Sequence, residues 1–221
     1  MTTKAKLGQI VPPLSVSEWV QGEPCDLEAL RGQVVLVEVF QVNCPGCFLY
    51  SLPQAIELYR RYSGQGLAVF GLATAFEDFD KNTLANLRLL LDTGEVIGET
   101  LRVLNDYGQL KSGCWPLSIP FPVAMDRLIK VEKPVSEQAV QAFMQQKLPD
   151  LSGHSVDYQQ KIKQRVVDYL QTLDYRAETF ERFDLQGTPS HILIDKQGML
   201  RACRFGEFSE LESEIRQLIA E

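Results

Sequence analysis

Two cysteines separated by two residues form the motif with the clearest chemical use in this sequence. Cys44 and Cys47 follow the apolar run 34–40, which reads VVLVEVF, and precede a stretch whose apolar residues are spaced for one face of a helix. A run that is apolar at almost every position is typical of a strand buried on both faces of a sheet. The cysteines are therefore predicted to lie where a buried strand passes into a helix.

This position would give the two thiols different roles. The unpaired N–H groups and the positive dipole end of the helix favour the thiolate form of Cys44. Cys47 lies about one helical turn further on, where its sulfur can attack a mixed disulfide formed by Cys44. We therefore interpret Cys44 as the attacking cysteine and Cys47 as the resolving cysteine of a pair that carries two electrons.

A Cys-x-x-Cys pair can also be half of a zinc site or can pack as inert core thiols. A structural zinc site needs four ligands, usually from two closely spaced pairs. The remaining cysteines and the histidines are scattered singly, at Cys25, Cys114, Cys203, His154 and His191. The sequence therefore predicts no metal site. It leaves Cys25 and Cys114 open as auxiliary thiols and assigns Cys203 to the core.

One acid interrupts the apolar run. Glu38 stands six residues before Cys44, and its burial is expected to favour the neutral carboxyl, which could exchange a proton with Cys47 near neutral pH. We therefore predict that Glu38 is a catalytic base for Cys47. The alternative is an ion-paired or partly exposed acid, because buried charges are usually paired.

A second motif lies far along the chain, at residues 187–198, which read GTPSHILIDKQG. Together with the strand, its acid and the cysteine pair, this motif resembles the thioredoxin-like superfamily, in its TlpA-like and redoxin (AhpC/TSA-related) branch. The resemblance implies an α/β, thioredoxin-like fold, in which a central mixed sheet is flanked by helices. It also implies an N-terminal hairpin over residues 22–32 and a large helical insertion before a strand that opens with a cis proline.

The resemblance also implies an enzyme, a thiol–disulfide oxidoreductase that reduces or exchanges disulfides without a cofactor. A cis Thr188-Pro189 bond beside the cysteines would leave the Thr188 backbone free to bind an extended substrate segment; a trans proline at a strand start is the alternative. Most relatives carry an aromatic residue where this chain has Asn43. We expect Asn43, Thr188 and Pro189 to bind substrate. Strand alternation leaves open whether His191 faces the cysteines.

Two other functions are alternatives for a chain with this cysteine pair. A peroxiredoxin-like thiol peroxidase would carry a Pro-x-x-x-Thr-x-x-Cys loop, but counting back from Cys47 places Cys44 and Phe40 at the Thr and Pro positions. A non-catalytic, metal-binding module of thioredoxin fold, such as a copper chaperone, would use a Cys-x-x-x-Cys pair, which is one residue longer. Both functions remain alternatives with less support.

Composition limits the partners. A chain of 221 residues, 45% of them hydrophobic, can bury a core, and we predict a single domain over residues 1–221. A formal net charge of −7 argues against nucleic-acid and anionic-membrane partners. Because no apolar run approaches ~18 residues and no leader is visible, we expect a cytoplasmic protein. Its partners would be an upstream thiol reductant and a protein or small-molecule disulfide.

The insertion, at about residues 127–182, has a helical pattern. Ser136 is predicted to cap a first helix that carries Val140 and Phe143. A second, longer helix is predicted from apolar residues that recur every three or four positions, at Ile162, Val166, Tyr169 or Leu170, Leu173, Ala177 and Phe180. We expect a helical hairpin that is either structural or a lid or docking arm near the cysteines.

Overall fold

The computed structural model describes residues 4–221, which divide into two compact units. Unit 1 comprises the described part of Met1–Leu128 together with Ala177–Glu221, and unit 2 is Ile129–Arg176. The chain thus leaves unit 1 once and returns to it once. A single domain with an insertion at about 127–182 stays a prediction.

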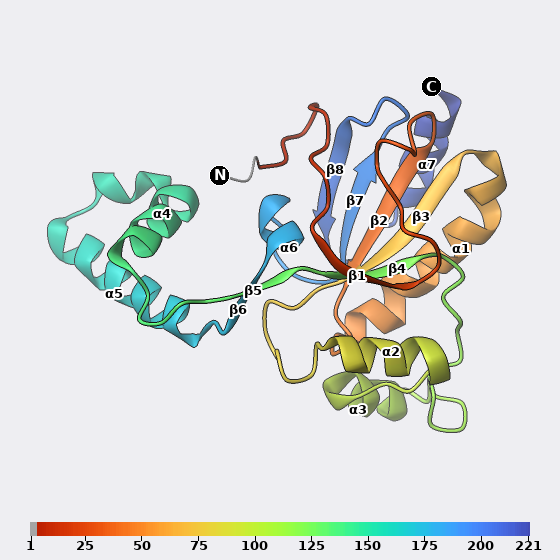
Figure 1. The fold of residues 1–221 in the computed structure, drawn as a ribbon, viewed down its shortest axis with the longest axis horizontal. Helices are drawn as coiled ribbons and strands as arrows, with labels where there is room; N and C mark the ends of the chain where they lie inside the picture. The colour runs from red at the N-terminus through yellow and green to blue at the C-terminus, as the bar shows by residue number, and fades with distance from the viewer. Residues whose placement is uncertain (1–3) are drawn as a thin grey trace. The chain divides into compact units, whose positions relative to one another are not determined.

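Unit 1 is built around a six-stranded mixed sheet in the order β1-β4-β3-β2-β7-β8 (Figure 1). In that order the strands are Val16–Gln21, Val123–Asp126, Leu67–Ala73, Val34–Phe40, Ser190–Ile194 and Leu200–Phe205. The central strand β2 runs parallel to β3 and antiparallel to β7. Every residue of β2 is buried, as its apolar run predicts.

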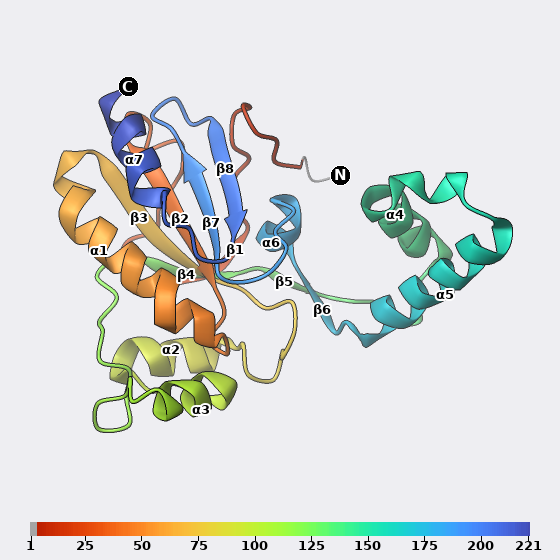
Figure 2. The same cartoon turned by 180° about the vertical axis from the view of Figure 1, so that it is seen from behind.

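Helices cover one face of the sheet, where Leu36 and Phe40 of β2 belong to the larger apolar cluster. The helices that contribute to this cluster are α1 (Leu52–Tyr62), α2 (Leu84–Thr93), α3 (Gly98–Asp106) and α7 (Leu211–Ala220). Figure 2 shows α1 and α7 in front of the sheet. Val35 and Val37 alternate onto the other face and pack with residues of the N-terminal segment and with the region of α6 (Glu178–Arg182). This mixed sheet flanked by helices confirms the predicted α/β, thioredoxin-like fold.

The expected N-terminal hairpin over residues 22–32 is not formed. The one strand of this region, β1, ends before Gly22 and pairs antiparallel with β4. Gly22 has a φ of +73°, a conformation that suits glycine, and Pro24 has no N–H to donate to a strand partner. The chain therefore leaves the sheet at Gly22, and Leu27 and Leu30 pack against the apolar face instead.

Unit 2 contains two α-helices, α4 (Glu137–Lys147) and α5 (Val156–Thr172), joined by a 3-10 helix at Pro149–Gly153. The Ser136 hydroxyl accepts a hydrogen bond from the backbone N–H of Ala139, so the predicted cap of the first helix is confirmed. Val140, Val166 and Leu170 form the small core of the unit.

The second helix is shorter than predicted. It ends at Thr172, because Leu173 is extended and the carbonyl of Asp174 accepts a hydrogen bond from the backbone N–H of Val131 at 2.9 Å. Ala177 and Phe180 consequently lie in β6 (Tyr175–Ala177) and α6. Ala177 and Phe180 continue the helical spacing of α5 only by coincidence, because they belong to two other elements.

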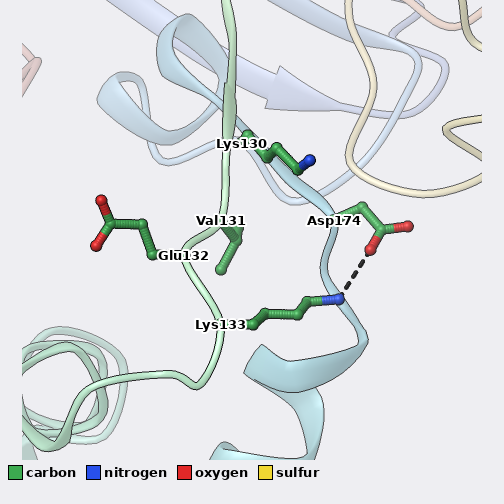
Figure 3. A pocket seen from close by; sticks show the side chains of 5 residues that line it. All are labelled: Lys130, Val131, Glu132, Lys133 and Asp174. Atoms are coloured by element: carbon green, nitrogen blue, oxygen red, sulfur yellow. Dashed lines mark hydrogen bonds and ion pairs between the residues drawn. The ribbon is translucent and has the colours of Figure 1, made fainter.

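The segments that enter and leave unit 2 are tied together. β6 pairs with β5 (Leu128–Lys130) in a two-stranded sheet. Figure 3 shows the ion pair beyond this ladder, in which Lys133 Nζ lies 2.8 Å from Asp174 Oδ1. The open hollow drawn there is lined by Lys130, Val131, Glu132, Lys133 and Asp174. Among the described residues, no helix combines the length and hydropathy needed to cross a bilayer.

Candidate active site

The cysteines lie at the predicted junction of strand and helix. The chain is helical from Pro45, with a wide π-helical turn at Cys47–Ser51 before α1 begins. Pro53 has no N–H to donate to the carbonyl four residues before it, so a regular α-helical ladder cannot run through this point. The wide turn directly before Pro53 accommodates that missing bond.

Cys44 and Cys47 form a disulfide, with their Cα atoms 5.4 Å apart. The backbone N–H of Cys47 donates to Cys44 Sγ at 3.3 Å. Such an N–H group at a helix start would also stabilise a thiolate at Cys44 in the reduced protein. Cys44 retains 9% of its accessible surface and Cys47 retains none. Only Cys44 is therefore open to a partner, in keeping with its predicted role.

The Thr188-Pro189 peptide is cis and lies against the cysteines, as predicted. The Thr188 carbonyl oxygen is 3.6 Å from Cys44 Sγ, and the Thr188 hydroxyl donates to Gln41 Oε1 at 2.9 Å. These loops meet because β2 and β7 are neighbouring antiparallel strands. The structure thus brings Thr188, Pro189 and Cys44 together, while their binding of substrate stays a prediction.

An exposed aromatic residue borders this loop and was missed from the sequence. Phe205, the last residue of β8, is 59% exposed and pairs in register with Ser190. Its ring covers Gly187, where a Cβ atom would lie only 2.5 Å from the Phe205 ring. Gly187 is therefore required for the ring to lie beside the cis proline. An aromatic residue at the end of the last strand was the one available signal.

The side chain of Asn43 has a structural role at the start of α3 that the sequence did not indicate. Its Oδ1 accepts the backbone N–H of Glu99 at 2.7 Å, and its Nδ2 donates to Asp78 Oδ2 at 2.7 Å. The amide thus caps the start of α3, which has no capping side chain of its own. Gly98 permits this approach, because a Cβ there would lie 2.5 Å from Asn43 Oδ1. Substrate binding by Asn43 stays a prediction.

Glu38 is buried and paired, so the structure shows the ion-pair alternative rather than an isolated acid. Its Oε2 lies 2.6 Å from Nδ1 of His191, its direct partner across β2 and β7. Burial acts to lower the pKa of His191, but the charge of Glu38 and the hydrogen bond with it act in the opposite direction and leave the pKa raised. His191 therefore lies on the same face as Glu38, a placement that strand alternation alone left open.

The other cysteines are free thiols. Burial, with a smaller contribution from the charge of Asp184, raises the pKa of Cys203 to about 11, and this half-buried thiol packs against the apolar cluster of its face. Burial also raises the pKa of Cys25. Across residues 4–221, no three histidine, cysteine or acidic side chains gather closely enough to hold a metal ion.

No protein-family model matches the chain. Among solved structures, the chain is similar to a thiol-disulfide isomerase from Corynebacterium glutamicum, with 26% identity and a TM-score of 0.60 over 97% of both chains. It is similar to the thioredoxin-like superfamily protein SPOA0173, with 26% identity and a TM-score of 0.59 over 99% of this chain and 97% of the other. The chain is thus a thioredoxin-like protein, similar to thiol–disulfide oxidoreductases of that superfamily. The predicted resemblance to the thioredoxin-like superfamily is thereby confirmed.

This thioredoxin-like protein also matches part of two curated relatives. It is 37% identical over 59 residues to DipZ of Mycobacterium bovis and to DipZ of Mycobacterium tuberculosis. The match covers 27% of this chain and 8% of DipZ. The likeness to DipZ thus concerns a short stretch of a much longer protein.

Proposed function

We propose that the Cys44–Cys47 pair reduces or exchanges disulfides of protein or small-molecule partners. One observation carries this proposal: the pair forms a disulfide at a helix start, with the cis Thr188-Pro189 loop 3.6 Å from Cys44 Sγ. The more exposed sulfur and the backbone that could align a partner are thus side by side. No specific observation favours the peroxidase or the metal-binding alternative.

The reaction would proceed through a mixed disulfide. The Cys44 thiolate attacks one sulfur of the partner disulfide, an S–S bond forms to Cys44, and the other partner sulfur leaves as a thiolate. Cys47 then gives up its proton and attacks Cys44 Sγ. This second step closes the Cys44–Cys47 disulfide and releases the second partner sulfur as a thiolate. The partner gains two electrons, and an upstream thiol reductant returns the pair to the dithiol.

The partner segment would lie along Thr188 in an extended conformation. This placement would bring its disulfide next to Cys44, the more exposed sulfur of the pair. Phe205, whose exposed ring lies over Gly187, offers apolar contact beside this loop. A disulfide in a flexible or unfolded polypeptide fits this arrangement, because such a chain can become extended.

Trapping the mixed disulfide tests the proposal. The Cys47→Ser variant should accumulate a disulfide between Cys44 and an unfolded, oxidised model protein such as scrambled ribonuclease, because the resolving thiol is absent. The Cys44→Ser variant is the matched control and should trap nothing, since Cys47 is buried. Non-reducing electrophoresis with peptide mass spectrometry would identify the cross-link. Equal trapping by both variants, or by neither, would contradict the proposal.

The cellular setting stays a proposal from the sequence. A cytoplasmic location would supply the thiol reductant that the cycle requires. It would also keep Cys25, Cys114 and Cys203 reduced, as they are in the structure.

A further inference from the structure

The pair formed by Glu38 and His191 lies in the same layer as the resolving cysteine. Leu36 and Phe40 of β2 and Cys47 all belong to the apolar cluster on the helix-covered face. Glu38 lies on the same face because side chains alternate along a strand. His191 lies directly opposite Glu38 on β7. The side chains of His191 and Glu38 are 2% and 0% exposed. A buried carboxyl–imidazole pair thus lies on the sheet face whose apolar cluster includes Cys47.

In each side chain of the pair, one polar atom is hydrogen-bonded and the other has no hydrogen-bond partner. Glu38 Oε2 and His191 Nδ1 bind each other, whereas Glu38 Oε1 and His191 Nε2 are buried without a hydrogen-bond partner in the protein. Buried polar atoms without a partner are rare in native proteins and often mark a functional group. The imidazole therefore leaves a single carboxylate oxygen available for proton exchange.

The charges around the pair come from the neighbouring strand and helix. Arg204 of β8 stands opposite His191, forms an ion pair with Glu214 of α7 at 2.5 Å and lies over the Phe208 ring. Its charge opposes the imidazolium, while Glu38 and the backbone of Gly206 favour it.

The remaining neighbours of the pair add little charge. On the other side of β2, strand β3 presents Gly71 opposite Glu38. The charged residues of α1, which are Glu57, Arg60 and Arg61, are exposed to solvent. Glu38 is therefore the acidic group in direct hydrogen-bond contact with His191.

We propose that His191 is a positioning residue of thiol exchange, which holds Oε2 of Glu38 and so leaves its free oxygen, Oε1, to accept the proton of Cys47. This inference rests on the proposed function and deepens it. A carboxylate alone in an apolar layer would take up a proton and could not act as a base. The adjacent imidazolium compensates its charge, so the carboxylate can accept the Cys47 proton when Cys47 attacks Cys44.

The test is the pH profile of the resolving step. Cys25, Cys114 and Cys203 are first replaced by serine, and the reduced protein is mixed with dithiobis(nitrobenzoate), a coloured disulfide. The first equivalent of nitrothiobenzoate reports attack by Cys44, and the second reports resolution by Cys47. Stopped-flow absorbance from pH 5 to pH 9 gives both rates.

His191→Gln should leave the first rate within about twofold and slow the second at least tenfold at pH 7. The midpoint of the second rate should move to higher pH, because the buried carboxyl then has no adjacent imidazolium to favour its charged form. Arg204→Gln should move the midpoint to lower pH, since it removes the cation that opposes the imidazolium. This second variant keeps the test decisive if His191→Gln does not fold.

Two controls separate positioning from structural support. Ile192→Val, on the same strand but facing the other apolar cluster, should lower stability without moving the midpoint. In a Glu38→Gln background, His191→Gln should cause no further slowing, because His191 acts through Glu38. An unmoved midpoint in both His191→Gln and Arg204→Gln would overturn the inference while leaving the proposed function intact. Loss of the two-phase release in the parent would instead contradict the proposed function.

Discussion

The thiols of Cys44 and Cys203 differ in their surroundings and therefore in ease of ionisation. Cys44 lies at a helix start, where a backbone N–H points at its sulfur, whereas burial raises the pKa of Cys203 to about 11. At pH 7, limited iodoacetamide should therefore label Cys44 of the reduced protein well before Cys203 or the buried Cys47. Peptide mass spectrometry over a time course provides the measurement. Labelling of all three at one rate would contradict this assignment.

The pairing of Glu38 also sets an expectation for stability. Glu38→Gln removes one partner of a buried pair and should lower the free energy of unfolding by about 1–3 kcal/mol. Because the folded-state pKa of His191 is raised, the pair's contribution is fully present below the unfolded histidine pKa of ~6.5. It is lost as the pH rises through the higher folded value.

The difference between wild type and Glu38→Gln should therefore be larger at pH 5.5 than at pH 8.5 in urea unfolding. Glu57→Gln, at an exposed position of α1, serves as the control and should show no such trend. A Glu38→Gln variant that is more stable than wild type would show that the carboxylate is not compensated by His191.

Among the elements, the start of α3 depends on a contact from the active-site loop. Gly98 has a φ of +58°, and a Cβ there would lie 2.5 Å from Asn43 Oδ1. Gly98→Ala should lower the free energy of unfolding by about 1–2 kcal/mol from the left-handed backbone alone, with more from loss of the Asn43 cap. Gly64→Ala is the matched control, because nothing lies within 4 Å of its added Cβ. Equal effects of the two substitutions in urea unfolding would contradict this account.

The elements also show how far the sequence could predict the fold. β2 was predictable because a short run that is apolar at almost every position indicates a buried strand. The start of α4 was predictable because Ser136 is a typical N-cap residue. The end of α5 could not be predicted, because apolar residues at helical spacing continue through Ala177. The backbone nevertheless becomes extended at Leu173. The predicted hairpin failed because its resemblance to a family lead-in carried no information about the strand partner.

The candidate site also contains residues that the sequence could identify and residues that it could not. Cys44, Cys47 and the Thr188-Pro189 segment lie in local motifs, so the sequence identified them. The contact between His191 and Glu38 depends on the register between β2 and β7, which no local pattern reveals. Phe205 was missed for a related reason, because its exposure depends on how β8 ends beside the cis-proline loop.

At the scale of the whole molecule, Asp126 links the two segments of unit 1 between which unit 2 is inserted. Its carboxylate accepts hydrogen bonds from the Thr74 hydroxyl and from the backbone N–H groups of Thr179 and Phe180. Burial raises the pKa of Asp126 to about 6, although these hydrogen bonds act to lower it. The folded state thus favours the neutral carboxyl.

This shift should make stability depend on pH. An acid with a raised folded-state pKa contributes stability that is present below its unfolded value of ~3.9 and is lost as the pH rises through about 6. Relative to Asp126→Asn, the wild type should lose about 2 kcal/mol between pH 4 and pH 7, since one pKa unit corresponds to ~1.4 kcal/mol and part of the effect lies below pH 4. Urea unfolding of both proteins across this range tests the trend. A constant difference would exclude it.

Unit 2 should be dispensable for the fold of unit 1. The backbone N–H of Glu178 donates to the carbonyl of Arg127 at 2.9 Å, so the ends left by removing Ile129–Arg176 are close enough for a short glycine-serine linker. The shortened protein should unfold cooperatively and keep Cys44 reactive toward dithiobis(nitrobenzoate). Circular dichroism and thiol titration are the measurements. A shortened chain that is soluble but lacks a cooperative transition would mean that unit 2 is part of the same folding unit.

The closeness of Arg127 and Glu178 also affects the chain entropy of bringing the candidate site together. Glu38 and His191 are 153 positions apart, and unit 2 accounts for the residues from Ile129 to Arg176 within that span. Because loop-closure entropy grows only with the logarithm of loop length, these extra residues add about 0.3 kcal/mol to the cost of bringing β2 and β7 together. Once β5 and β6 pair, even that small term falls away. The connection can therefore lengthen or shorten without weakening the strand pairing that holds Glu38 against His191.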